Sequence, residues 1–144
     1  MRTAGTGYGQ PMRRDPRFSS VPGIERGRRF EPKPKNVRAA REFVADTLRD
    51  EGFAGDPDVV LLLTSELVTN AVRHAATPFE IRVDVEPDKV RVAVIDEDVE
   101  HSPEVRHPGP DDTNGRGLLL VDRLAAVWGS NRDGRNKSVW FTLA

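Results

Sequence analysis

Cysteine is absent from the 144 residues of this chain, which excludes disulfide bonds and thiolate metal sites. No apolar run approaches the length of a membrane span, because Thr, Glu and Asp interrupt the longest hydrophobic segments. The N-terminus lacks the hydrophobic core of a signal peptide, and no internal repeat is present. Aromatic residues make up only 6%, and none are interleaved with a basic face. We therefore expect one small cytoplasmic domain that binds neither membrane nor nucleic acid directly.

Charge is distributed unevenly along the chain. Residues 1–35 carry nine Lys or Arg and three acidic residues, whereas residues 36–144 carry thirteen and twenty. The first segment also holds five Gly and five Pro, a composition that buries little apolar surface. We expect residues 1–27 to form a disordered basic tail and residues 28–144 to form the domain, with a short edge strand at Phe30. Such a tail could contact nucleic acid, a membrane, an acidic partner or the acidic body of the chain, or it has no dedicated partner.

The segment 59–76 predicts the central helix of the domain. Asp56 is suited to the N-cap position and Pro57 to the first helical position. An apolar stripe recurs at helical spacing on one face and predicts burial. Its members are Val60, Leu63, Leu67, Ala71 and Ala75.

A second face of this helix carries Glu66, Asn70 and His74, which recur every four residues. An amide oxygen can bind a hard cation, and a carboxylate one turn away can polarise a water or a hydroxyl. The pattern also fits a half-buried row of capping and hydrogen-bonding side chains. The helix alone does not decide between these two interpretations.

The flanking segments predict the rest of the scaffold. A helix from Asn36, its expected cap, to about Glu51 ends at Gly52. Alternating apolar residues predict two antiparallel strands at 79–85 and 89–95, joined by a tight turn at Pro87.

Asp96 ends the second of these strands and either points into a pocket or caps a turn. Residues 97–114 are acidic and lack periodicity, so we expect a flexible loop, and loops of this length commonly act as lids or binding surfaces. Gly115 and Gly117 precede an apolar helix, where open backbone N–H groups would suit a phosphate or tight packing.

The C-terminal segment predicts a second hairpin, with strands at 128–132 and 137–143. The order of helices and hairpins favours an α+β fold, a two-layer sandwich with a mostly antiparallel sheet and helices on one face.

Three motifs in fixed order carry a resemblance. They are E-L-V-T-N-A-V-R-H-A at 66–75, Asp96 at a strand end, and G-R-G-L-L-L-V-D at 115–122 followed by Trp128-Gly129. The chain resembles the ATP-binding fold shared by histidine kinases, gyrase B, Hsp90 and MutL. Within that group it is similar to the stand-alone bacterial anti-sigma-factor serine/threonine protein kinases and their regulatory relatives. The resemblance covers about residues 28–144.

The resemblance implies a role for each matching position. Asn70 would coordinate Mg2+, Glu66 would be the general base, and His74 would line the same pocket. Asp96 would accept a hydrogen bond from the exocyclic amine of adenine, and residues 97–114 would be the ATP lid. The phosphates would be wrapped by the backbone and side chains that open the last helix, namely Gly115, Arg116, Gly117 and Leu118.

One stretch departs from the family pattern. The wider family usually has two glycines in a D-x-G-x-G motif, whereas this chain has D-E-D-V-E at 96–100. The three additional carboxylates are expected to crowd the pocket entrance and to repel a triphosphate unless Mg2+ or Arg116 offsets them.

Two functions follow from the resemblance. The first is a kinase that uses ATP and Mg2+ to phosphorylate a small anti-anti-sigma antagonist, with a sigma factor competing for the kinase. The second is a catalytically weak or inactive module that sequesters a regulatory partner. A homodimer is possible in either case. The catalytic domain of a histidine kinase is disfavoured, because no dimerising helical hairpin with a phosphoacceptor histidine precedes the domain, and His101 and His107 lie in the loop.

Overall fold

The computed structural model describes residues 24–75, 77–97, 116–134 and 136–143. In chain order the elements are β1 (Ile24–Phe30), α1 (Lys35–Asp50), α2 (Pro57–Asn70), a π-helical turn η1 (Ala71–Ala75), β2 (Phe79–Glu86), β3 (Lys89–Asp96), α3 (Arg116–Leu124), β4 (Val127–Asp133) and β5 (Asn136–Leu143). No helix within these ranges is both long enough and apolar enough to cross a lipid bilayer.

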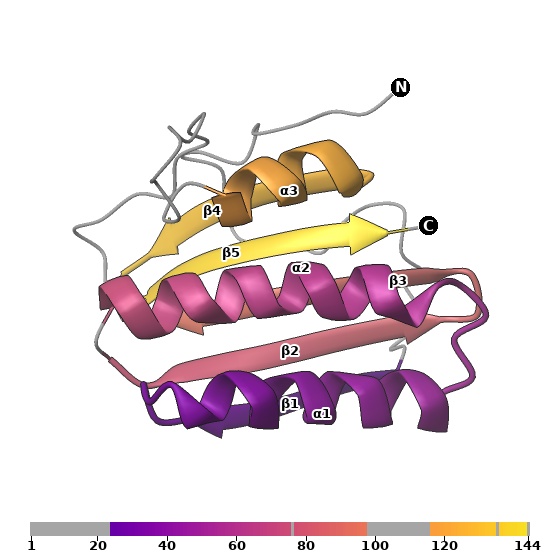
Figure 1. Ribbon diagram of the computed structural model, residues 1–144, viewed down its shortest axis with the longest axis horizontal. Coiled ribbons are helices and arrows are strands. Elements are labelled where there is room, and N and C mark those ends of the chain that lie inside the picture. The colour runs from indigo at the N-terminus through magenta and orange to yellow at the C-terminus, as the bar shows by residue number, and fades with distance from the viewer. Residues whose placement is uncertain (1–23, 76, 98–115, 135, 144) are drawn as a thin grey trace.

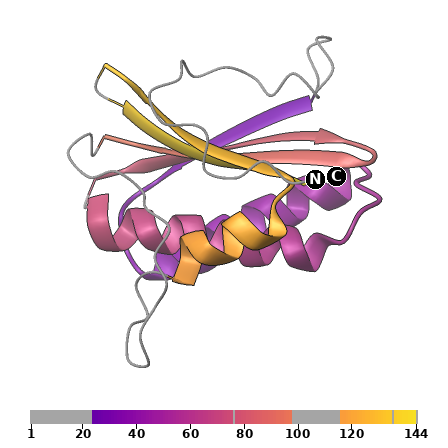
Figure 2. The same ribbon diagram turned by 90° about the horizontal axis from the view of Figure 1, so that it is seen from above.

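The five strands form one sheet in the order β1-β2-β3-β5-β4, and every neighbouring pair is antiparallel (Figure 1). The three α-helices lie together on one face of this sheet (Figure 2). The structure therefore confirms the two-layer α+β fold and both expected hairpins.

The core lies between the sheet and the helices. Strand residues of alternating position supply one side of it, as the periodicity of β2 and β3 predicted. Each helix contributes one stripe of apolar side chains to the other side of the core. The fully buried members include Val44, Val60, Leu63, Phe79, Ile81, Val83, Val90, Val92 and Phe141.

Strand β1 is longer than expected. It pairs with β2 from Ile24 to Phe30, so the domain boundary expected at residue 28 falls inside a strand. The ring of Phe30 stacks on that of Phe79 at 5.5 Å between centroids and packs edge-on against Phe43. Backbone pairing along the edge of β2 thus orders residues 24–27, although their side chains lack an apolar alternation.

The starts of the two long helices differ in their capping. The Asp56 side chain accepts a 2.9 Å hydrogen bond from the backbone N–H of Asp58, which confirms the expected cap of α2. The expected cap of α1 is wrong, because α1 begins at Lys35 and Asn36 lies inside it. The Asn36 amide instead donates to the carbonyl of Glu31 at 2.8 Å.

One further expectation needs correction. The central helix is not α-helical to residue 76, because η1 follows Asn70. At the end of α3, Val121 and the following Ala125 are buried, whereas Leu124 is 43% exposed.

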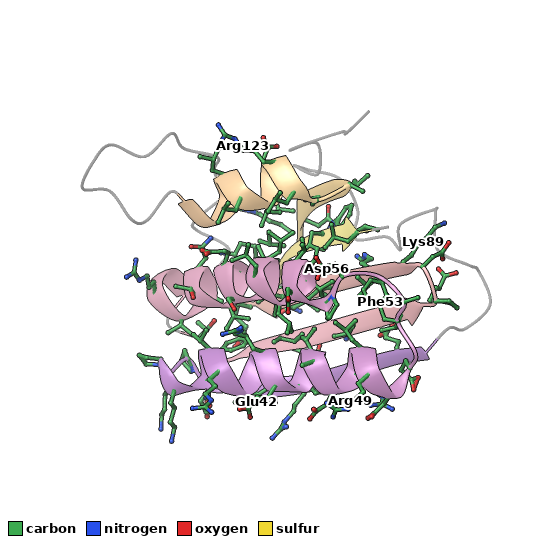
Figure 3. All side chains as sticks on the ribbon, turned by 45° about the vertical axis from the view of Figure 1, so that its right-hand side comes forward. Glu42, Arg49, Phe53, Asp56, Lys89 and Arg123 are labelled. Atoms are coloured by element: carbon green, nitrogen blue, oxygen red, sulfur yellow. The ribbon has the colours of Figure 1, made fainter. Side chains whose placement is uncertain are left out.

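One end of the molecule serves as scaffold. Phe53, Asp56 and Lys89 gather there, where the α1–α2 connection meets the β2–β3 turn (Figure 3). The backbone N–H of Ala54 donates to the carbonyl of Pro87 at 2.7 Å and links the two connections. Asn70, at the end of α2, and Asp96, at the end of β3, lie at the opposite end.

Candidate functional site

Four elements meet at the opposite end of the sheet from the β2–β3 turn. The C-terminal end of α2, the end of β3, the start of β5 and the start of α3 all lie on this side (left in Figure 1). The turn η1 contacts β3, and α2 packs against α3. The antiparallel topology therefore brings together motifs that are far apart in the sequence.

Glu66 and Asn70 lie one turn apart on α2, and both are half-buried. Among the described residues, neither side chain has a hydrogen-bond or ion-pair partner. Their neighbours differ, because the hydroxyls of Thr64 and Ser65 donate to backbone carbonyls one turn earlier at 2.8 and 2.9 Å. Half-buried polar groups usually serve structure through such bonds. The alternative of a hydrogen-bonding row thus finds no support at Glu66 and Asn70 in this part of the chain.

The carboxyl group of Glu66 is electrostatically unusual. Desolvation by burial raises the pKa of Glu66 above its usual value, because removal from water disfavours the charged form. A carboxylate with a raised pKa accepts a proton more readily, which is the property that a general base requires.

His74 lies inside η1, and its side chain is outside the described part of the structure. Side chains four residues apart align over one another in an α-helix, but the wider π turn changes this spacing. The ladder expected from the sequence is therefore α-helical only from Glu66 to Asn70.

Asp96 is buried at the end of β3. It follows Val92 and Val94 in the alternation that faces the helices, so its side chain lies on the same side of the sheet as the core. Its paired neighbours are Phe79 in β2 and Lys137 in β5. Asp96 is only 3% exposed, so its carboxylate does not project into solvent.

Lys137 is a residue that the sequence motifs did not indicate. Its Nζ lies 3.7 Å from Oδ1 of Asp96, and the two side chains are only 9% and 3% exposed. A signal for it was present, because Lys137 alternates with Val139 and Phe141, which face the core. A lysine in such a position must lie on the helix-facing side of the sheet.

Glu97, the first of the three additional carboxylates, takes part in an exposed ion pair. Its carboxylate lies 3.9 Å from the guanidinium of Arg29 on β1, with both side chains exposed. Its backbone N–H is held by the Thr77 hydroxyl at 3.2 Å. Asp98 and Glu100, the other two carboxylates, lie outside the described residues.

Helix α3 begins at Arg116 with Gly117 in its first turn. The first N–H groups of an α-helix lack partners within the helix, which suits them to bind an anion. Gly115 and the side chains of Arg116 and Leu118 are outside the described part of the structure. Their expected contacts with phosphate therefore stay predictions.

The side chains of Asn70 and Asp96 have the chemistry that Mg-ATP requires. Mg2+ commonly takes one protein oxygen and completes its shell with water and phosphate oxygens, which a single amide at Asn70 would satisfy. Within residues 24–75, 77–97, 116–134 and 136–143, no three His, Asp or Glu side chains form a metal cluster. The carboxylate of Asp96 is an acceptor suited to an exocyclic amine.

Comparison with known proteins places this arrangement in a family. The family model described as a histidine kinase-like ATPase domain matches residues 30–143, which include every element from the end of β1 to β5. A comparison with curated proteins found no match. Domains of this kind bind ATP, usually with Mg2+. The chain therefore belongs to the histidine kinase-like ATPase domain family.

Proposed function

We propose that this chain is an ATP-binding regulatory protein of the anti-sigma-factor serine/threonine kinase type. In this proposal it phosphorylates a small antagonist protein and sequesters a sigma factor. The observation that supports the proposal most strongly is the pair Glu66 and Asn70 on α2. Both side chains are half-buried and have no partner among the described residues. They lie toward the end of the sheet at which β3 ends with Asp96.

Each site residue has one task in this proposal. Bound Mg-ATP supplies the phosphoryl group and a cation that neutralises its charge. The Asn70 amide oxygen would hold the cation, Asp96 would accept a hydrogen bond from the base, and His74 would line the pocket. The Glu66 carboxylate takes the proton from the attacking serine or threonine hydroxyl. The phosphates would be held by Gly115, Arg116, Gly117 and Leu118.

The partner logic comes from the resemblance. Unphosphorylated antagonist and sigma factor compete for the same protein, so phosphorylation of the antagonist leaves the sigma factor bound. The raised pKa of Glu66 supports the catalytic half of this proposal, because it favours proton acceptance.

A second function is a partner-sequestering module without turnover. Two observations favour it. The sequence lacks the two glycines after Asp96 that let a backbone approach the base, and a buried ammonium from Lys137 lies beside the Asp96 carboxylate. Both features are expected to lower nucleotide affinity, whereas Glu66 and Asn70 are present as the kinase proposal requires.

Phosphate transfer separates the two functions. The purified chain is incubated with γ-labelled ATP, Mg2+ and an extract of its own source cells, beside a Glu66→Gln variant with an otherwise matched active site. The kinase proposal predicts a protein labelled on serine or threonine with the wild type and not with the variant. Nucleotide binding by both proteins without any Glu66-dependent label would favour the sequestering module instead.

A further inference from the structure

The sheet has a second face, which carries none of the three α-helices (Figure 2). Strand register places Ala93 of β3, Trp140 of β5 and Gly129 of β4 in one row on this face. None of the described elements lies over that row. We propose that residues 18–23, which directly precede β1 in the chain, pack across this face and cover it. The inference goes beyond the proposed function and does not depend on nucleotide binding.

The middle of this face is buried although no helix covers it. Ala93 is buried in β3, and so are Ser138 and Thr142, which flank Trp140 on the same face of β5. An antiparallel sheet with one face in water usually carries polar side chains that reach the solvent there. The burial of small polar side chains in this row is therefore typical of a covered face rather than of a solvated one.

Two polar groups on this face lack partners. The indole Nε1 of Trp140 and the hydroxyl Oγ of Ser138 are buried, and neither has a hydrogen-bond partner among the described residues. The Arg91 guanidinium lies 5.1 Å from the Trp140 ring centroid, but it carries only donors and cannot accept from Nε1. An indole N–H requires an acceptor when it is buried. The backbone carbonyls of an extended segment would supply acceptors of this kind.

The start of β1 puts such a segment within reach. Ile24, the first residue of β1, lies at the same level of the sheet as Leu143 of β5. Three strand spacings, about 14 Å, separate these two residues, and Trp140 lies about 10 Å farther along β5. Six extended residues span about 20 Å, which is enough to bring Phe18 over Trp140.

The composition of the segment suits this route. Residues 18–23 read F-S-S-V-P-G. The Pro-Gly pair directly before β1 has the chemistry of a turn, which the chain needs in order to reverse from the edge strand onto the face. Phe18 supplies an apolar ring to pack on that of Trp140. Gly129, beside Trp140, has no side chain that would keep another segment away.

Paramagnetic broadening in NMR spectra tests this packing, because the chain has no cysteine and only two tryptophans, one on each face of the sheet. Asp15→Cys in the full chain carries a nitroxide label close to Phe18. We expect the label to abolish the indole N–H signal of Trp140, whereas the signal of Trp128, on the helix-facing side, is retained. Phe18→Ser should restore the Trp140 signal. The matched control Tyr8→Ser, which removes an aromatic ring outside the segment, should not.

The labelled and isotope-enriched chain is diluted into an excess of chain without label or enrichment, so that only contacts within one molecule broaden its signals. Equal effects on the two indole signals, or a Trp140 signal that survives, would overturn the inference. So would a Trp140 loss that is unchanged by Phe18→Ser. Broadening that appears only when the nitroxide sits on a second, non-enriched chain would also overturn it and would assign the face to a second copy. The phosphate-transfer test of the proposed function is independent of all these outcomes.

Discussion

The indole Nε1 of Trp128 donates a 3.0 Å hydrogen bond to Oδ1 of Asp122, which ties helix α3 to the start of strand β4. Trp128 is 1% exposed, so this bond satisfies a donor that water does not reach. Asp122 is the acidic residue that ends the G-R-G-L-L-L-V-D motif, and Trp128 is the tryptophan just beyond that motif. Their joint occurrence in the sequence therefore has a structural reason.

Removal of the acceptor should destabilise the domain. Asp122→Ala leaves the buried Trp128 Nε1 without this partner, which should lower the free energy of unfolding by about 1–3 kcal/mol. Asp122→Asn keeps an acceptor oxygen and should lose clearly less. Urea denaturation monitored by tryptophan fluorescence measures both variants. Equal stability of Asp122→Ala and the wild type would show that the bond contributes nothing.

The raised pKa of Glu66 predicts a pH dependence of stability. The folded state binds the Glu66 proton more tightly than the unfolded state, so the stability linked to this proton is present at low pH. It is lost as the pH rises from below about 4 through the raised pKa.

Glu66→Gln removes this titration. The variant should therefore gain melting temperature relative to the wild type between acidic and neutral pH, and the two should converge at the acidic end. Thermal denaturation across this range measures the difference. A constant difference at all pH values would argue against desolvation of Glu66.

On the sheet face opposite the helices, Arg91 and Asp84 form a buried ion pair at 3.6 Å. The Arg91 guanidinium also lies 5.1 Å from the ring centroid of Trp140. Arg91→Met removes the cation from beside a carboxylate that is 3% exposed, so it should reduce stability by about 3 kcal/mol or more. The double variant with Asp84→Asn should recover part of this loss, which a chemical denaturation cycle would detect. Strictly additive losses would mean that the two residues do not couple.

Much of this fold follows from sequence patterns. Strict alternation in β2 and β3 fixes which side chains face the core, and Asp56-Pro57 fixes the start of α2. These signals are local, because each depends on the backbone geometry of one element. The helix motif at 66–75 and the acid at the end of the second strand predicted Glu66, Asn70 and Asp96 as site residues, and the fold places them toward one end of the sheet.

Other features depend on contacts that no local pattern encodes. The first residues of β1 have no apolar alternation, and the neighbouring strand β2 orders them through the backbone. The π turn after Asn70 has no sequence signature, so the sequence favoured a continuous helix. Lys137 was missed because its meaning depends on its register with Asp96 on another strand. The roles of His74 and Gly115 stay predictions.

The measurement that tests the account most directly is calorimetric titration of the full chain with Mg-ATP, beside Asn70→Ala. Asn36→Ala, which removes an amide from α1 rather than α2, is the matched control. The account predicts saturable binding by the wild type and the control, and binding weaker by about tenfold or more in Asn70→Ala, because the cation loses its protein ligand. Absence of binding by the wild type at about millimolar ATP, or equal affinity in Asn70→Ala, would contradict the central claim that Mg-ATP binds at this end of the molecule through Asn70.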